Sequence, residues 1–351
     1  MLVHICCSVD SHYFLAQLQK DYPDEKLIGF FYDPNIHPYS EYRLRLYDVK
    51  YSCDILGIEL IEGEYDFEQW LTLTKGLEDE PEKGARCNVC FDRRLEVTVQ
   101  KAVELGERYF TTTLLMSPKK SQEKLETIAQ KLALEYECKF VFKNYRIKNG
   151  VELQGKEVKK YNIYRQNYCG CMFALNKQRN EQNKLTDELF SPINKQILPE
   201  SIESRLELYK ERTPNSDIIK QRFLNYRVLS AKVEIEKRVV NSYFLCYSTL
   251  NKNKTSGKIV KTIDNIAYLN KDEVKLISLE YFNTLANTNY NTTLELVYNP
   301  PKFDAELKIR EKIVYSSYDL SCVIVLDILP SSKLTIWCDS KIYEDVRDVY
   351  M

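Results

Sequence analysis

Six of the eleven cysteines fall into three closely spaced pairs, and this arrangement constrains the fold more than any other feature of the chain. The pairs are Cys6-Cys7, Cys87-x-x-Cys90 and Cys169-x-Cys171. Asp10 follows the first pair by three residues. Thiols so close in sequence rarely bridge one another in a reducing compartment, and they can share a soft metal ion. The sequence therefore predicts an iron–sulfur or related metal site, and a fold that brings three distant segments to it.

The number of donors argues against a simple zinc site. The six thiols and Asp10 make seven candidate ligands, whereas one tetrahedral zinc takes about four. A second CxxC at the spacing of a zinc ribbon is also missing. Dithiol redox chemistry and coincidence stay open as alternatives on the residues alone. The other five cysteines lie among apolar neighbours or in strand-like runs, where a free thiol acts as a small hydrophobic group: Cys53, Cys138, Cys246, Cys322 and Cys338.

Composition and charge exclude some classes of protein. The chain has 351 residues, 44% hydrophobic and 29% charged, which is typical of a soluble protein of about two domains. No apolar run reaches the roughly 18 residues of a membrane helix, and no secretory leader is present. We therefore expect a cytoplasmic protein without a membrane partner. The formal charge of −1 gives no bulk sign of nucleic-acid binding, so any RNA contact must come from a local patch such as the lysine-rich residues 119–148.

The first half of the chain alternates strand-like and helix-like segments. Strands are predicted at 1–5, 27–32, 58–63, 108–115 and 139–142, and helices at 11–20, 40–56, 66–75, 88–105 and 121–136. This alternation predicts a Rossmann-like, nucleotide-binding-like α/β fold with a parallel sheet. Sites in such folds lie beyond the carboxyl ends of the strands. We expect Cys6-Cys7, the loop Asp33–Pro38 and the segment Thr112–Ser117 to meet there in one crevice, because each follows a strand.

The second half has a different pattern. Residues 176–200 are polar and typical of a connector, and residues 201–212 are predicted to be helical. Beyond about residue 222 come short runs of strand character, several of them alternating apolar and charged residues as antiparallel strands do: KVEIEKRVV, SYFLCYS, VKLISLEYF, TLELVYN, AELKIREKIVYSS, CVIVLDIL and KLTIWC. The predicted organisation is a catalytic α/β iron–sulfur domain at 1–175, a connector and helix at 176–221, and a β-rich accessory domain at 222–351.

Five motifs in the first half occur in an order that resembles a known family. They are CCSVDS, FYDPNIHPYSEY, GLEDEPEKGARCNVCFDRRL, YFTTTLLMSPKKS and YRQNYCGC. Together they resemble the cobalamin-independent epoxyqueuosine reductases of the QueH type, over residues 1 to about 175. The resemblance implies a [4Fe–4S] cluster with a neighbouring mononuclear iron or other divalent metal. It also implies reduction of epoxyqueuosine in a tRNA anticodon to queuosine, with the modified tRNA and a low-potential electron donor as partners.

The resemblance also assigns site residues. The family's cysteine positions match Cys6, Cys7, Cys87, Cys90, Cys169 and Cys171, and Asp10 matches a position that is Cys or Asp. Which thiols hold the cluster and which the lone ion stays open. Removing an epoxide oxygen benefits from a Lewis acid, and a hard carboxylate such as Asp10 suits that ion. Arg165 and Gln166 offer charge and directed donors beside Cys169, so they are candidate catalytic residues; the alternative is a turn that positions the CxC.

Two other functions compete with this interpretation. The segment Cys6-Cys7-Ser8-Val9-Asp10-Ser11 resembles the Ser-Gly-Gly-x-Asp-Ser loop of ATP pyrophosphatases, which include tRNA-thiolation enzymes. In that loop glycines let the backbone approach the pyrophosphate. Cysteines replace them here, so no ATP is expected. A non-catalytic RNA-binding protein stabilised by a metal is the remaining alternative.

Overall fold

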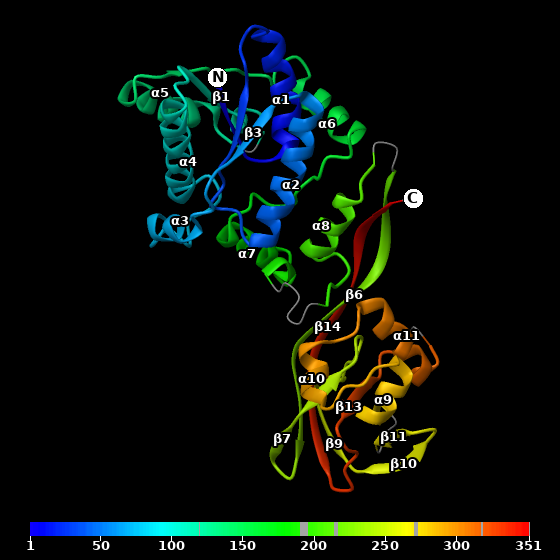
Figure 1. Cartoon of the computed structure of the whole chain (residues 1–351). Coiled ribbons are helices and arrows are strands. Elements are labelled where there is room, and N and C mark those ends of the chain that lie inside the picture. Colours follow the sequence, from blue (N-terminus) through cyan, green and yellow to red (C-terminus); the bar gives the residue numbers. More distant parts are fainter. Residues whose placement is uncertain (119, 190–195, 214–216, 270–272, 317–318, 351) are drawn as a thin grey trace. The chain divides into compact units, whose positions relative to one another are not determined.

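The computed structural model describes the whole chain except residues 119, 190–195, 214–216, 270–272, 317–318 and 351. The chain forms two compact units (Figure 1). The first comprises residues 1–190, 205–218 and 350–351, and the second comprises 191–204 and 219–349. Among the described residues, no helix combines the length and apolarity needed to cross a membrane.

The first unit is built on a five-stranded sheet in the order β3-β2-β1-β4-β5. Every strand pair in it is parallel. The strands are β1 Leu2–Ile5, β2 Ile28–Phe31, β3 Glu59–Glu62, β4 Tyr109–Thr112 and β5 Lys139–Phe140. The helical segments are α1 Ser8–Asp21, α2 Tyr39–Leu56, α3 Phe67–Leu73, α4 Ala85–Glu104, η1 Thr113–Leu115, α5 Gln122–Glu135, α6 Gly150–Lys160, α7 Met172–Glu181, η2 Asp187–Leu189 and α8 Ile202–Lys210. The predicted Rossmann-like parallel α/β fold is confirmed, and its strand order reverses between β1 and β4, where such folds place their sites.

Local differences from the predicted elements have physical reasons. The strand predicted at 108–115 ends at Thr112, because the Thr112 hydroxyl accepts a hydrogen bond from the Leu114 amide and starts a 3-10 turn. Helices α6 and α7 were not predicted. The buried residues of α6 are only Gly150, Gln154 and Val158, so its apolar stripe is too narrow and too polar to stand out. In contrast α2 ends as predicted at Gly57, whose φ of 65° is left-handed.

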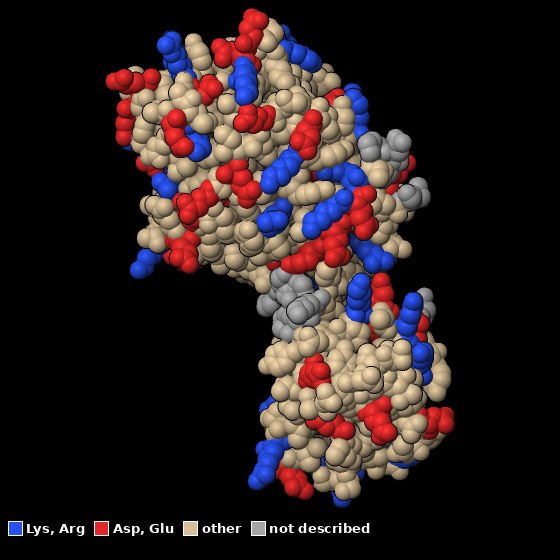
Figure 2. Space-filling model, in the orientation of Figure 1, with Lys and Arg blue, Asp and Glu red and all other residues tan. Residues whose placement is uncertain are grey.

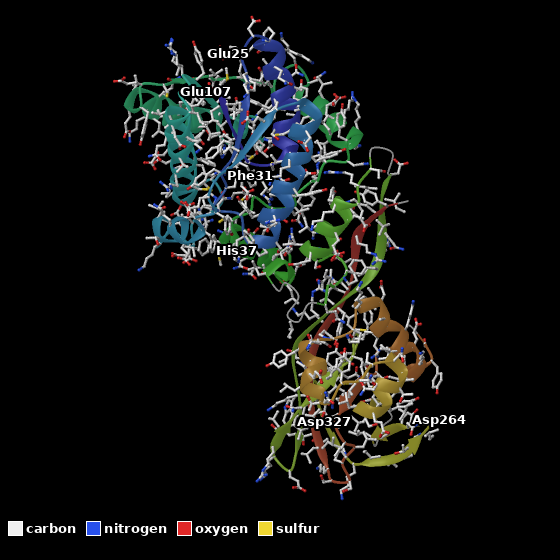
Figure 3. The ribbon with its side chains drawn as sticks, in the orientation of Figure 1. Glu25, Phe31, His37, Glu107, Asp264 and Asp327 are labelled. Carbon is white, nitrogen blue, oxygen red and sulfur yellow. The ribbon has the colours of Figure 1, made fainter. Side chains whose placement is uncertain are left out.

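The amino and carboxyl ends of the strands in this sheet have different roles. All four residues of β1 are buried. At the amino ends of the strands, the Met1 amine donates to the Lys26 carbonyl at 2.8 Å and to Glu107 at 2.7 Å. Figure 3 shows Glu25 and Glu107 at this end of the unit, Phe31 within the sheet, and His37 toward the opposite end. Polar and ionic contacts thus cover the amino ends of the strands, whereas the candidate site lies beyond their carboxyl ends.

The second unit contains two sheets, β10-β11-β12-β13-β8 and β7-β6-β14-β9. The strands are β6 Ile218–Ile235, β7 Arg238–Val240, β8 Ser242–Phe244, β9 Lys254–Gly257, β10 Ile259–Ile263, β11 Ile266–Leu269, β12 Val274–Ser278, β13 Cys322–Leu326 and β14 Leu334–Tyr350. Val233 and Ile336 of one sheet pack with Leu276 and Ile324 of the other in one apolar cluster. A second cluster joins the five-stranded sheet to helices α9 Leu279–Ala286, α10 Thr293–Tyr298 and α11 Phe303–Val314. The β-rich class predicted for this region is confirmed.

Three runs predicted as strands in the second unit are wholly or partly helical. The end of VKLISLEYF forms α9, TLELVYN forms α10, and AELKIREKIVYSS forms α11. The Ser278 and Thr292 side chains cap the first two helices, and α11 buries residues three and four apart, not two. These helices connect β12 to β13 as a crossover, so this pair is parallel and not antiparallel as expected.

Candidate metal centre and active site

A cavity of about 300 Å³ lies beyond the carboxyl ends of the strands in the first unit. It is lined by all the predicted site residues: Cys6, Cys7, Asp10, Cys87, Cys90, Arg165, Gln166, Cys169 and Cys171. The loop after β2 contributes Asp33 and Asn35, and the segment after β4 contributes Leu114 and Ser117. The expected convergence of three strand ends on one crevice is therefore confirmed. Its size is within the range of small-ligand sites.

The first cysteine pair occupies the turn between β1 and α1, at the reversal of strand order. The Cys6 and Cys7 sulfurs are 3.6 Å apart, and the Cys6 sulfur is 3.9 Å from the Asp10 carboxylate. The ligand atoms of all three residues lie within 4.8 Å of one another. Two thiolates that each bind one ion at about 2.3 Å are at most about 4.6 Å apart. The three side chains thus form a preformed group of ligands that can bind one ion together.

Burial without a cation makes this group unfavourable in its charged form. A hydrogen bond with Cys6, then burial, raises the pKa of the Cys7 thiol well above its usual value. Burial also raises the pKa of Asp10, although the Gln154 side chain partly opposes this. The Gln154 amide donates to Asp10 Oδ1 at 3.0 Å and to the Val9 carbonyl at 2.7 Å. A bound cation would offset the burial penalty, because it favours deprotonated ligands.

The second pair lies in the first two turns of α4. A separation of three residues puts Cys87 and Cys90 on one side of the helix. Cys87 is half-buried and its sulfur accepts a hydrogen bond from the Lys83 amide at 3.2 Å. Cys90 is buried, and burial raises its pKa while the Arg94 charge lowers it. Both thiols therefore face the cavity from a rigid element.

The third pair lies on a loop that depends on a glycine. Gly170, between Cys169 and Cys171, has a φ of 102°, and a Cβ there would come within 2.8 Å of an Ile36 carbon. Only glycine fits this backbone. Hydrogen bonding from Cys171, then the charge of Lys120, lowers the pKa of Cys169 to about 5 against the effect of burial. Cys169 is thus disposed to bind a metal as a thiolate.

Gln166 and Arg165 differ in their contacts with the site. The Gln166 amide lies 3.0 Å from the Cys7 sulfur, and its Oε1 has no hydrogen-bond partner among the described residues. Arg165 is exposed and lines the cavity at its rim. Gln166 therefore connects the third cysteine segment to the first, while Arg165 is free to meet a ligand that enters.

The structure adds residues that the sequence analysis missed. Arg45, on α2, donates to Glu41 at 2.7 Å, to the Tyr168 carbonyl at 3.0 Å and to the Cys169 carbonyl at 3.3 Å. The His37 amide donates to the Gly170 carbonyl at 2.9 Å. In sequence Glu41 and Arg45 are an i, i+4 pair, which normally indicates a solvated helix face. Glu41 belongs to the motif FYDPNIHPYSEY, which carries no cysteine, and Arg45 lies three residues beyond it, so neither residue stood out in the sequence.

The lysines near this site line two neighbouring cavities. Lys120 is 12% exposed, lies 3.7 Å from Glu82 and lines the thiol cavity. A neighbouring cavity of about 170 Å³ is lined by Lys83, Lys120 and Lys124 and shares Cys87 with the first. Lys119 lies outside the described residues. On the face shown in Figure 2, acidic and basic side chains are interspersed over the first unit.

Fold and site together define a cysteine-rich α/β protein whose three cysteine pairs gather beyond the strand ends, at the strand-order reversal. Residues 1–177 match the family model described as epoxyqueuosine reductase QueH. A relative of that name from Helicobacter pylori is 40% identical over 365 residues, 98% of either chain. The chain therefore belongs to the epoxyqueuosine reductase QueH family and is an oxidoreductase, as the motifs indicated.

Other similarities delimit what the family membership covers. A relative of the same name from Thermotoga maritima is 36% identical over 190 residues, which are 53% of this chain and 95% of that one. Most of the second half of the chain thus has no counterpart in that relative. The structure of the U34-tRNA thiolase NcsA from Methanococcus maripaludis with its [4Fe-4S] cluster gives a TM-score of 0.34 at 15% identity, over 59% of this chain and 73% of that one. That similarity is too weak to support any inference.

Proposed function

We propose that this protein reduces the epoxide of epoxyqueuosine in a tRNA anticodon to the cyclopentene of queuosine. The observation that carries the proposal is that all six paired cysteines and Asp10 line one cavity in a chain of this family. The reaction consumes two electrons and two protons and releases the epoxide oxygen as water. A low-potential electron donor is needed as a partner. A tRNA substrate also favours a cytoplasmic protein.

The donor set fits a [4Fe–4S] cluster with an adjacent iron or other divalent ion. Six thiols in one cavity exceed the four that such a cluster binds, and the group of Cys6, Cys7 and Asp10 can hold an ion beside it. Five cationic side chains also line the cavity and offset the charge of thiolates: Arg45, Arg86, Arg94, Lys120 and Arg165. When bound, the cluster would supply single electrons and the ion would polarise the C–O bond.

The chain's own residues would prepare these groups for the substrate. Asp10 supplies the hard ligand, and Gln154 fixes one of its oxygens. Gln166 reaches Cys7 with its amide and keeps an oxygen without a partner among the described residues, which suits it to orient a ligand. Arg165 at the rim would contact the incoming anticodon. Cys7, Asp10 and Gln154 are buried, which would limit the access of bulk water to the reacting bond.

The cavity lined by Lys83, Lys120 and Lys124 supports a phosphate contact beside the site. The tRNA backbone is recognised largely through such charges. Residues 1–175 would carry the chemistry, 176–221 would connect, and the β-rich residues 222–351 would hold tRNA away from the anticodon. The short Thermotoga relative agrees with this division, since most of the second half has no counterpart there.

The test is a direct assay of the reaction. Anaerobically purified protein is incubated with tRNA that carries epoxyqueuosine and with a low-potential reductant, and the nucleosides are analysed by mass. We expect queuosine to form in the wild-type protein and not in a Cys87→Ala variant. Release of pyrophosphate from ATP would instead favour the pyrophosphatase-like alternative. A colourless, zinc-loaded protein that binds tRNA without converting it would favour a non-catalytic role.

A further inference from the structure

Residues 205–212 belong to the first unit although they lie beyond the region that matches the family model. They include most of α8 and follow the polar segment 176–200. Figure 1 shows α8 beside α2, and the contacts below join the same parts of the chain. We propose that two arginines of this segment, Arg205 and Arg212, position the Cys169–Cys171 loop by fixing Tyr164. These residues are positioning residues, since they act through others.

The two arginines hold Tyr164 at both ends. Arg205 donates to the Tyr164 hydroxyl at 3.2 Å. Arg212 donates to one Asp48 oxygen at 2.6 Å, and the other Asp48 oxygen accepts the Tyr164 backbone amide at 3.1 Å. Tyr164 and Asp48 are buried, at 3% and 1% exposure. Because its backbone amide and its hydroxyl both form hydrogen bonds with buried charged groups, Tyr164 is restricted in both backbone and side-chain position.

From Tyr164 a chain of hydrogen bonds leads to the cysteine loop. The Tyr164 hydroxyl donates to Glu41 at 3.1 Å, and Glu41 accepts from Arg45 at 2.7 Å. Arg45 in turn donates to the carbonyls of Tyr168 and Cys169. Glu41 is fully buried and Arg45 is 3% exposed. Charged groups at such depth hold their geometry tightly. A buried charge that loses its partner cannot be solvated by water instead, so the loss costs free energy.

Simple attachment of a helix would not require this arrangement. The buried Tyr209 ring already packs against the Tyr164 ring, with 5.2 Å between the centroids, and such apolar contact can attach a helix. Instead, the guanidinium groups of Arg205 and Arg212 donate hydrogen bonds to the Tyr164 hydroxyl and the Asn162 carbonyl, just before the segment that begins at Arg165. Arg212 also lies 3.5 Å from the ring centroid of Tyr51 on α2. Residues 205–212 therefore contribute to the geometry of the first unit's cavity.

Hydrogen–deuterium exchange tests this in the full-length protein, purified anaerobically. The variants are Arg205→Met, which keeps the apolar stem, Tyr164→Phe, which deletes one hydroxyl, and their combination. The readout is exchange in a peptide spanning 165–172, compared with peptides from β1 and β4 of the same sample. We expect exchange there to become about tenfold faster in each variant, since hydrogen bonds to charged groups are the strong class. The double variant should add little, because both changes break one chain of contacts.

Lys210→Met is the matched control, since it removes an exposed positive charge from the same helix. It should leave exchange unchanged. Equal acceleration in β1, β4 and the loop would mean that the arginines only stabilise the fold, and would overturn the proposal. Wild-type exchange of the loop in both Arg205→Met and Tyr164→Phe would overturn it as well. The readout does not involve epoxide reduction, so its outcome is independent of the proposed reaction.

Discussion

Replacing Gln154 by leucine should weaken the binding of the lone ion without disturbing the cysteines. The Gln154 side chain is 5% exposed and its amide donates to Asp10 and to the Val9 carbonyl. A hydrogen bond to a carboxylate contributes about 1.5–3 kcal/mol. Its loss corresponds to roughly 10- to 100-fold weaker metal binding, the range found when partners of metal ligands are removed. Leucine has nearly the same volume, so the expected cost in packing is small.

The effect should depend on pH in a defined direction. Burial raises the pKa of Asp10 in the folded protein, and the Gln154 amide counteracts that rise. Without the amide the pKa rises further, whereas metal binding needs the carboxylate. The pH at which the ion binds half-maximally should therefore move upward in Gln154→Leu. The deficit should be largest at low pH and should shrink as the pH rises.

The assay counts the iron that remains per chain after dialysis against a graded series of chelator concentrations, at several pH values. Lys156→Leu is a suitable control, because Lys156 lies on the same helix and is exposed. Asp10→Ala is the companion variant, and should lose the lone ion and most turnover while keeping the colour of the cluster. Wild-type affinity and pH dependence in Gln154→Leu would refute the reasoning. Normal turnover in Asp10→Ala would reduce Asp10 to a structural residue at the start of α1.

Three further predictions address the metal, the cysteines and the lysines. Anaerobic protein should contain about five irons, if one lone ion accompanies a four-iron cluster; a single zinc and no iron would contradict this. Cys87→Ala should abolish epoxide reduction, while Cys322→Ala, in the second unit, should leave it intact at a cost of about 1–3 kcal/mol in unfolding free energy; full activity of Cys87→Ala would exclude a shared site. Replacing Lys83 and Lys124 by glutamate should weaken tRNA binding and flatten its salt dependence, whereas Lys131→Glu, two turns along α5, should not; equal effects would indicate general electrostatics.

The sequence predicted the parts of the fold that depend on periodicity and chain order. Strand–helix alternation gave the parallel sheet, and the rule on carboxyl ends placed Cys6-Cys7 beside the segments after β2 and β4. Helix α6 was not predicted, since it buries only a narrow stripe that includes a polar glutamine. In the second unit, apolar and charged residues alternate in α11 closely enough to suggest a strand, and only burial at helical spacing shows otherwise.

The polar framework behind the cysteines could not be predicted for a different reason. Tyr164, Glu41 and Arg205 are distant in sequence, and each alone is typical of an exposed or ordinary residue. Their meaning depends on burial, which is a property of the tertiary fold. A glutamate that is fully buried must have partners, but the sequence does not show which glutamates are buried. Such networks therefore become visible only once the chain is folded.

The cationic side chains of the cavity bear on why the metal-free site should be unstable. Arg86 is tied to the Leu77 and Glu78 carbonyls, and Arg94 is paired with Asp33. These arginines are thus fixed by the fold, and they remain positive beside thiols whose pKa burial raises, Cys90 among them. Without metal, burial opposes deprotonation of Cys7 and Cys90, because it raises the pKa of both thiols. A bound metal would favour their deprotonated forms and relieve this penalty, so the free energy of metal binding should appear directly as stability of the first unit.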